Sequence, residues 1–410
     1  MHVHKKAIVF AVVLMLFLLT RIWILLNPAY YTDANGENRG FSDVKHYYER
    51  YANNWRYGLT PYFEHLYEYP PLSIPILYLP LAIDQRGIGT YYLNYRVGVF
   101  IFDVILFTVI VATLFSLTND VRKIILSSVY YIFTGLIARN FLYEGLDLYL
   151  AGTFTLGLVW WYWRPSSSYI NSLVFWIFLV LSSSIKLMTL PLILPFLLLR
   201  INWTTWKHEI LGLGVSLGLF WGIPLLIWRS SLSVFVIFNA QRPVKYGAFG
   251  TWFIEIINDF TKSEYRLNEA PDFPMIGPVS ATTTQVVVTV FLLSMLGVLA
   301  YLCWYAIKSR HIQLRSVQLT TSVTMTLFFF FVLFLTTKTF SSPFHVWYIP
   351  LFPLLVLIPY SKLLPLFGFG LFMPLMDTTD FVKAPQGAIG VVPYNRFRDL
   401  CRFLPMIATL

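Results

Sequence analysis

Charged residues are scarce in this sequence. Only 12% of its 410 residues are Asp, Glu, Lys or Arg, whereas 57% are hydrophobic. Soluble domains carry about 25% charged residues, so the composition excludes an ordinary soluble domain and favours a polytopic membrane protein. The net charge of +10 does not indicate nucleic-acid binding, because the basic residues are scattered at the ends of apolar runs and form no basic block.

The sequence also lacks the motifs of several common site types. Its two cysteines, Cys303 and Cys401, cannot form a dense disulfide framework. There is no Gly-rich phosphate loop, no zinc-type spacing of Cys and His, no G-x-S-x-G turn and no fixed-period repeat. His46 and His65 do not stand at a standard metal-binding spacing relative to Asp43.

Apolar runs near the length of a membrane-spanning helix are abundant, and they predict an all-α bundle of about 10–12 transmembrane helices. The predicted helices cover residues 7–26, 93–117, 124–138, 146–163, 169–184, 186–200, 210–228, 285–306, 317–336, 345–360 and 363–376. Residues 169–200 are interpreted as two passes that meet at "SSSIK", with one bent passage as the alternative. We predict one membrane domain over residues 1–376, followed by a tail, 377–410.

The short loops predict the orientation. With a cytoplasmic N-terminus, every short inner loop carries at least one basic residue, as the positive-inside rule requires. The polar outliers then share the extracytoplasmic face: Asp43, Glu144, Asp147, Lys186, Arg242, Lys338 and His345. One-sided clustering of this kind indicates a site at one membrane surface, and it depends on residues 169–200 making two passes.

Two outer segments, 27–92 and 229–284, are long enough to fold outside the bilayer. In the first, aromatic residues recur at helical spacing between Ser42, a plausible N-cap, and Gly58, a plausible stop. The second contains "NAQRPVKYGAFGTWFIEIIND" before a Pro-rich stretch. Each segment is predicted to place an amphipathic helix along the membrane interface.

Several motifs, in chain order, carry a resemblance to a known family. They are "SDVKHYY", "YGLTPYFEHLYEYPPL", "NFLYEGLDLYLAGTFTLGL", "SSSIKLMTLPLILPFLLL", "NAQRPVKYGAFGTW" and "KTFSSPFHVWYIPLFPLL". On these motifs the chain resembles the GT-C superfamily of membrane glycosyltransferases. It is most similar to glycosyltransferase family 87, the bacterial polyprenol-phosphate-mannose-dependent mannosyltransferases with a DUF2029-type domain. It departs from the D-x-D pattern of many GT-C enzymes, because Val44 and Lys45 follow Asp43, and this departure fits a metal-independent member without a cofactor. Phe344 and His345 replace the family's usual late pair.

The resemblance implies an inverting hexosyltransferase at the extracytoplasmic face of the cell membrane. Its donor would be a polyprenyl phosphate sugar, with mannose as the favoured hexose and glucose or arabinose as alternatives. Its acceptor would be a lipid-linked sugar or a glycan, and a monomer is expected. A transporter or flippase of lipid-linked sugars is the main alternative, although such proteins place polar residues near the bilayer midplane and show internal repeats.

Asp43 is the candidate catalytic base. It stands at the first turn of the predicted interfacial helix, where the helix amides favour an ionised carboxylate. A base there would take the proton of the acceptor hydroxyl. The alternative is that Asp43 only caps its helix. His345, the second catalytic candidate, would orient a sugar hydroxyl or contact the leaving phosphate, although a lone His at a helix start is more often structural.

Four basic residues are candidates to bind the donor phosphate, because a cation must stabilise the phosphate that departs: Arg242, Lys338, Lys186 and Lys245. Arg242 is favoured, since its planar fork can donate two hydrogen bonds to a phosphate. The alternative for each is an interfacial side chain that reaches lipid phosphate.

The acceptor and sugar candidates are Glu68, Tyr69, Glu144, Asp147 and Tyr47. Glu144 and Asp147 are three residues apart at a helix start and are predicted to share one face. Glu68 is also a reserve base, with an ion pair to an arginine as its plainer role. Asp103 lies inside an apolar run, where a charge costs about 3 kcal/mol, and we expect it to pair with Arg139 or Lys186.

Overall fold

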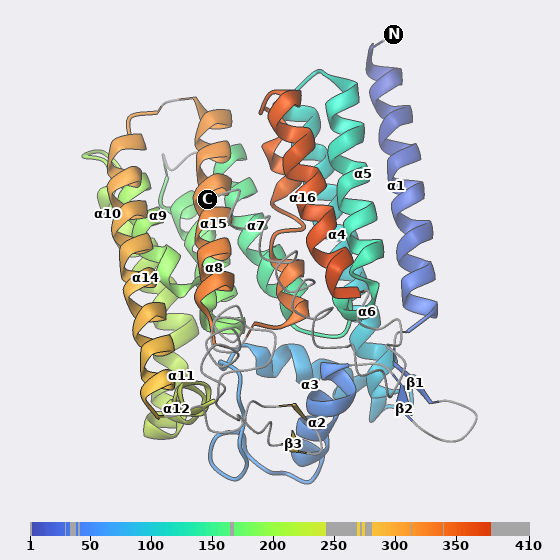
Figure 1. The fold of residues 1–410 in the computed structure, drawn as a ribbon, viewed down its shortest axis with the longest axis vertical. Helices are drawn as coiled ribbons and strands as arrows, with labels where there is room; N and C mark the ends of the chain where they lie inside the picture. Colours follow the sequence, from blue (N-terminus) through green and yellow to red (C-terminus); the bar gives the residue numbers. More distant parts are fainter. Residues whose placement is uncertain are drawn as a thin grey trace, which may run out of the picture.

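The computed structural model describes residues 2–28, 30–32, 38–39, 42–164, 168–242, 269–270, 273–274, 281–312, 314–338 and 340–378. The apolar runs form a bundle of upright helices, and shorter segments cover one end of it (Figure 1). The N-terminus lies at the opposite end.

Five helical stretches are long and apolar enough to cross a membrane: Lys6–Leu26, Tyr91–Leu117, Trp206–Ala240, Val287–Ser309 and Arg315–Thr336. They belong to α1 (His2–Leu26), α4 (Tyr91–Leu117), the run from α10 (Trp206–Leu217) to α12 (Ser233–Gln241), α14 (Ala281–Ser309) and α15 (Arg315–Thr336). Within the third stretch, η3 (Gly218–Gly222), α11 (Ile223–Trp228) and η4 (Arg229–Leu232) follow α10. The prediction of an all-α protein with potential membrane spans is confirmed, and the total of about 10–12 stays a prediction.

Shorter helices fill the rest of the bundle: α5 (Val121–Ile137), α7 (Asp147–Trp163), α8 (Tyr169–Ile185), α9 (Ile193–Arg200) and α16 (Tyr360–Thr378). Each lies close to a predicted range. The 3-10 turn η2 (Leu187–Leu192) precedes α9, because Pro191 and Pro195 interrupt the hydrogen-bond ladder there.

Residues 169–200 form two antiparallel segments, as predicted. Ser172, at the start of α8, and Arg200, at the end of α9, both contact Glu209. Lys186, between the two segments, instead pairs with Asp147 at the opposite end of the bundle. The chain therefore runs the length of the bundle and returns within this stretch.

Three helix predictions are wrong. Residues 345–360 form no continuous helix but two buried 3-10 turns, η5 (Ser342–Trp347) and η6 (Phe352–Leu355), because prolines recur there at 343, 350, 353 and 359. The outer segment predicted to start at residue 229 is helical as far as Gln241. A helix missed in the first segment, α3 (Ser73–Asp84), forms despite two prolines. Most of the stretch "NAQRPVKYGAFGTWFIEIIND", where an interfacial helix was predicted, lies outside the described residues.

The covering segments at the lower end of Figure 1 are η1 (Val44–Tyr48), α2 (Glu49–Arg56), α3, α6 (Arg139–Leu142) and the two-residue strands β1 (Tyr31–Thr32), β2 (Asn38–Arg39), β3 (Glu269–Ala270) and β4 (Phe273–Pro274). The bounds predicted for the first interfacial helix are confirmed. Ser42 Oγ accepts a hydrogen bond from the amide of Lys45, and Gly58 ends the helix at φ +82°.

The partner of the buried Asp103 differs from the one predicted. Its partner is Arg21, and not Arg139 or Lys186: Arg21 Nε lies 2.9 Å from Asp103 Oδ2, and both side chains are fully buried. The pairing follows from the packing of α1 against α4 and α5. Arg139 instead lies over the ring of Trp23.

Candidate functional site

Two carboxylates converge beside Gly145 at the covered end of the bundle. A Cβ atom added to Gly145 would lie 2.8 Å from Asp147 Oδ2 and 3.5 Å from Asp43 Oδ2. Asp43 precedes η1, whereas Asp147 is the first residue of α7. The fold therefore brings together two acids that are far apart in the sequence, and the absence of a side chain at Gly145 permits their close approach.

Asp147 is anchored through only one of its carboxylate oxygens. Oδ1 accepts hydrogen bonds from Lys186 Nζ and from Trp347 Nε1, each at 2.6 Å. Oδ2 is buried and has no hydrogen-bond partner among the described residues. The residue is only 1% exposed. A buried carboxylate oxygen normally accepts at least one hydrogen bond, so Oδ2 is the unusual polar group of this cluster.

Asp43 is half-buried at the start of η1, next to the Ser42 cap. Burial raises the pKa of the neighbouring Tyr48 well above its ordinary value, and the charges of Asp43 and Asp147 raise it further. Burial, Asp43 and Glu68 likewise raise the pKa of Tyr47. These phenols stay protonated, so they can donate hydrogen bonds to the site.

Glu68 and Arg242 form an ion pair between the first covering segment and the end of α12. Glu68 is buried, whereas the Arg242 side chain is 39% exposed and also lies over the ring of Phe238. This ion pair with an arginine is the alternative role predicted for Glu68. A guanidinium carries five N–H donors, so the part-exposed Arg242 side chain has more donors than its bond to Glu68 uses.

Lys338 lies close to Arg242. Its ammonium donates a hydrogen bond to the carbonyl of Ala240. Burial lowers the pKa of Lys338, and the positive charge of Arg242 lowers it further. Two of the predicted phosphate-binding cations are therefore neighbours, while Lys186 is bound to Asp147 and Lys245 lies outside the described residues.

Glu144 does not share a face with Asp147, which corrects the prediction. It lies in the bend before α7 rather than in the helix. Its carboxylate accepts hydrogen bonds from Ser42 and Tyr92 and lies 3.5 Å from Arg96 Nη1. Burial raises the pKa of Glu144, whereas Arg96 and the two hydroxyls oppose the shift. These contacts tie the Ser42 cap to α4.

His345 is fully buried in η5. Its Nδ1 lies 2.9 Å from the hydroxyl of Tyr348, and its ring packs near Phe340 and Phe141. Two residues further along the same turn, Trp347 reaches Asp147. The late motif thus contacts the acid cluster through its tryptophan.

The aromatic candidates lie around the same cluster. The Tyr69 ring packs at right angles to the Tyr48 ring, with 5.5 Å between centroids, and Tyr62 donates a hydrogen bond to the Tyr69 carbonyl. Tyr69 is half-buried, as is Tyr47. Both therefore contribute to the walls around the two acids.

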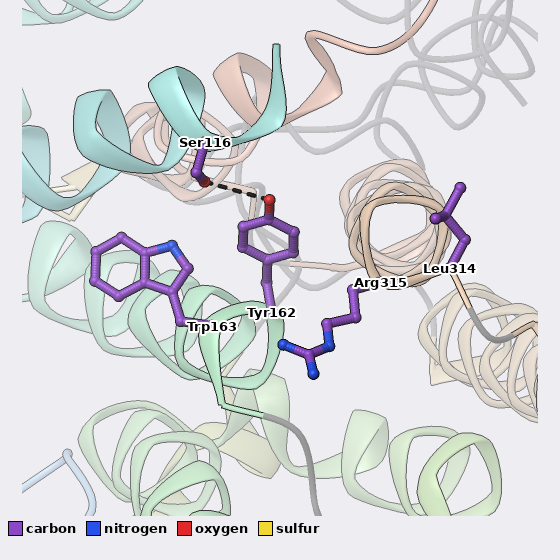
Figure 2. Close-up of a pocket in the computed structure, with 5 residues that line it drawn as sticks. All are labelled: Ser116, Tyr162, Trp163, Leu314 and Arg315. Atoms are coloured by element: carbon purple, nitrogen blue, oxygen red, sulfur yellow. Dashed lines mark hydrogen bonds between the residues drawn. The ribbon is translucent and has the colours of Figure 1, made fainter.

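Two surface cavities lie at the other end of the bundle, away from this cluster. One, of about 560 Å³, is lined by Ser116, Tyr162, Trp163, Leu314 and Arg315 (Figure 2). The Tyr162 hydroxyl points toward Ser116 there, at 3.3 Å. The second, of about 1130 Å³, is lined by Lys6, Asn119, Asp120, Val121, Arg122, Leu126 and Tyr360. Lys6, Arg122 and Arg315 line these cavities and stand in predicted inner loops. They therefore lie at the end of the bundle opposite the acid cluster.

Within the described ranges, no three His, Cys, Asp or Glu side chains gather in a way that could hold a metal ion. The expectation of metal independence stays a prediction. What the acid cluster can do chemically is accept protons or hydrogen bonds at two carboxylates, beside cations that can attract an anion.

Sequence reasoning missed two residues that shape the cluster. They are Trp347, which stands within the late motif, and Gly145, which lies between Glu144 and Asp147. The sequence signal at Gly145 is a glycine that stands between acidic residues at the start of a helix. Such a glycine allows close packing but does not require it. The long-range contact of Trp347 left no local signal.

No protein-family model matches this sequence, and no curated protein sequence matches it. The class of protein therefore follows from the fold: an α-helical protein with several helices that could span a membrane. Its function must be inferred from the cluster at the covered end.

Proposed function

We propose that this protein is an inverting glycosyltransferase of the GT-C type, with about 10–12 transmembrane helices. It transfers a hexose, with mannose favoured, from a polyprenyl phosphate to a lipid-linked or glycan acceptor. Its site faces the extracytoplasmic side of the cell membrane. The resemblance of its motifs to glycosyltransferase family 87 motivates the choice of donor.

The observation that carries the proposal is the meeting of Asp43 and Asp147 beside Gly145, with cations from three other segments at the same end. Transfer from a phosphate-linked sugar needs a base for the acceptor hydroxyl and positive charge for the leaving phosphate. Both kinds of group lie where the bundle meets its covering segments. A donor with a long lipid tail would place its phosphate at that level if the apolar helices span the bilayer.

In the proposed reaction, an acceptor hydroxyl oxygen attacks the anomeric carbon of the donor sugar. The bond from that carbon to the phosphate oxygen breaks, and polyprenyl phosphate departs with the electron pair. Asp43 takes the hydroxyl proton as the new glycosidic bond forms. A single displacement of this kind inverts the anomeric configuration, and it needs no covalent intermediate on the protein.

Arg242 and Lys338 are the proposed cations for the leaving phosphate. Arg242 offers a planar fork, and its part-exposed guanidinium can turn from Glu68 to a phosphate oxygen. Lys338 adds a second charge nearby. Lys186 holds Asp147 and is assigned a smaller part in phosphate binding. His345 is buried, and its proposed contribution is to fix the turn that carries Trp347.

The test is a transfer assay with purified protein, radiolabelled polyprenyl phosphate mannose and a membrane extract as acceptor. Asp43→Asn should reduce the rate by about 10²–10⁴-fold, because general-base catalysis contributes that much. The matched control is Asp84→Asn, which removes a carboxylate of the covering segments that pairs with Arg56 at the surface. This control should retain full activity.

Equal transfer by Asp43→Asn and the natural protein would remove Asp43 from the mechanism. Absence of transfer with mannose, glucose and arabinose donors alike would refute the proposed function. Movement of a lipid-linked sugar across vesicles without transfer would then favour the transporter alternative.

A further inference from the structure

We infer that Asp147 and Asp43 together bind two neighbouring hydroxyl groups of the acceptor, which must therefore be a polyol with a vicinal diol. Asp43 takes the proton of the hydroxyl that reacts, and Asp147 Oδ2 accepts a hydrogen bond from the adjacent hydroxyl. This inference rests on the proposed function and assigns a specificity-determining role to Asp147.

The first argument is the unequal use of the two oxygens of Asp147. Lys186 and Trp347 hold Oδ1 from two different elements, which fixes the orientation of the carboxylate. Oδ2 has no donor among the described residues, although the side chain is 1% exposed. Leaving a buried charged acceptor unsatisfied is costly, so a donor supplied by a ligand would recover that cost on binding.

The second argument is the position of Oδ2 relative to Asp43. It lies 2.8 Å from the position that a Cβ of residue 145 would occupy, and Asp43 Oδ2 lies 3.5 Å from the same position. A ligand that donates to Asp147 Oδ2 on this side of the carboxylate therefore lies close to the proposed base. One hydroxyl cannot both lose its proton to Asp43 and keep donating that proton to Asp147, but two adjacent hydroxyls can serve the two acids.

The third argument is the chemistry of the surroundings. Lys186 already compensates the charge of Asp147, so the free oxygen calls for a neutral donor rather than a second cation. Phenols of Tyr47 and Tyr48, which stay protonated, lie around Asp43 and supply the partly apolar walls that a sugar ring packs against. A hydroxyl-rich ring fits this combination better than an amine.

Asp147→Asn provides the decisive variant. The amide oxygen can keep both donors that Oδ1 now accepts, so the amide nitrogen replaces Oδ2 and turns a charged acceptor into a donor. Steady-state transfer should then show an acceptor KM raised by roughly tenfold or more, because a hydrogen bond to a charged group is lost. The KM for the donor lipid should change far less, because the main proposed phosphate cations, Arg242 and Lys338, are held by Glu68 and by the Ala240 carbonyl and not by Asp147.

Gly145→Ala is the second variant, and it preserves every polar side chain. Its Cβ would approach Asp147 Oδ2 to 2.8 Å, so the carboxylate must shift. It should reproduce the raised acceptor KM. The matched control is Gly214→Ala in α10, since a Cβ there meets no atom within 4 Å and the φ of Gly214 is not positive.

A chemical probe tests the diol directly. Mild periodate cleaves vicinal diols, so a periodate-treated membrane extract should lose most of its acceptor activity with the natural protein. A treated extract that remains a full acceptor, or an unchanged acceptor KM in both folded variants, would overturn the inference. The proposed function would survive these results, because it fails only if the natural protein transfers no sugar to the untreated extract.

Discussion

Arg21 and Asp103 form an ion pair with no solvent exposure, 2.9 Å apart, although 82 residues separate them. Tyr131 and Tyr143 donate hydrogen bonds to the same carboxylate. Arg21 also donates to two backbone carbonyls of α5, and Gly135 leaves the space for its guanidinium. The pair links α1, α4 and α5, so it stabilises the packing of three helices, and Tyr143 connects it to the bend before α7.

Removing one member of this pair should strongly destabilise the protein. Arg21→Met leaves the buried carboxylate of Asp103 without its cation, and the expected loss is about 3–5 kcal/mol. Thermal unfolding of the purified protein in detergent should show a clearly lower midpoint. The double variant with Asp103→Asn should recover part of the loss, and an unchanged midpoint in Arg21→Met alone would contradict the prediction.

The buried pair of Arg200 and Glu209 should depend on the shape of the guanidinium. Nε and Nη2 each donate to Glu209 at 2.9 Å, and the guanidinium lies over Phe175. Arg200→Lys keeps the charge but loses the fork, with an expected cost of about 2 kcal/mol. Thermal unfolding measures it against Arg164→Lys, which changes an exposed arginine. Equal midpoints for the two variants would disprove the role of the fork.

Glu144 should make stability dependent on pH. Burial raises its pKa in the folded protein, so the folded state binds a proton more readily than the unfolded state. Stability is therefore greatest below the ordinary carboxyl pKa and falls as the pH rises through the raised pKa. The thermal unfolding midpoint of the natural protein should fall as the pH is raised across this window. Glu144→Gln should flatten the profile, and an equal slope in the variant would assign the effect elsewhere.

Lys338 should limit donor use at high pH if the proposed function holds. Burial and the charge of Arg242 lower its pKa, so it loses its proton at a lower pH than an ordinary lysine. Transfer at low donor concentration should fall as pH rises through that lowered pKa. Arg242→Gln should move the fall to higher pH, because the repulsion is gone. Lys338→Arg should abolish it, since arginine stays charged.

The pH profile separates an electrostatic role of Lys338 from a structural one. If Lys338 were only structural, Lys338→Arg would alter the maximal rate, but the pH at which transfer falls would stay the same. A fall at the same pH in the natural protein and both variants would exclude Lys338 as its cause.

Local pattern predicted much of the fold. The long apolar runs predicted helices, and the polar residues at 42 and 58 predicted where the interfacial helix begins and ends. The prediction failed where prolines divide an apolar run into 3-10 turns, at residues 345–360, because hydropathy measures apolar content and not the hydrogen-bond ladder. It also failed at residue 229, because the polar residues of η4 interrupt the apolar run without ending it, and the apolar residues of α12 follow.

By itself, the sequence determined that this chain is rich in apolar helices and that its unusual polar residues fall at helix ends, since both properties depend on neighbours along the chain. Only the tertiary structure decided which charges meet. It paired Asp103 with Arg21, separated Glu144 from Asp147, and brought Asp147 to Asp43, Lys186 and Trp347. Such contacts depend on how helices pack across the bundle, and a buried charge takes whichever partner that packing brings within reach.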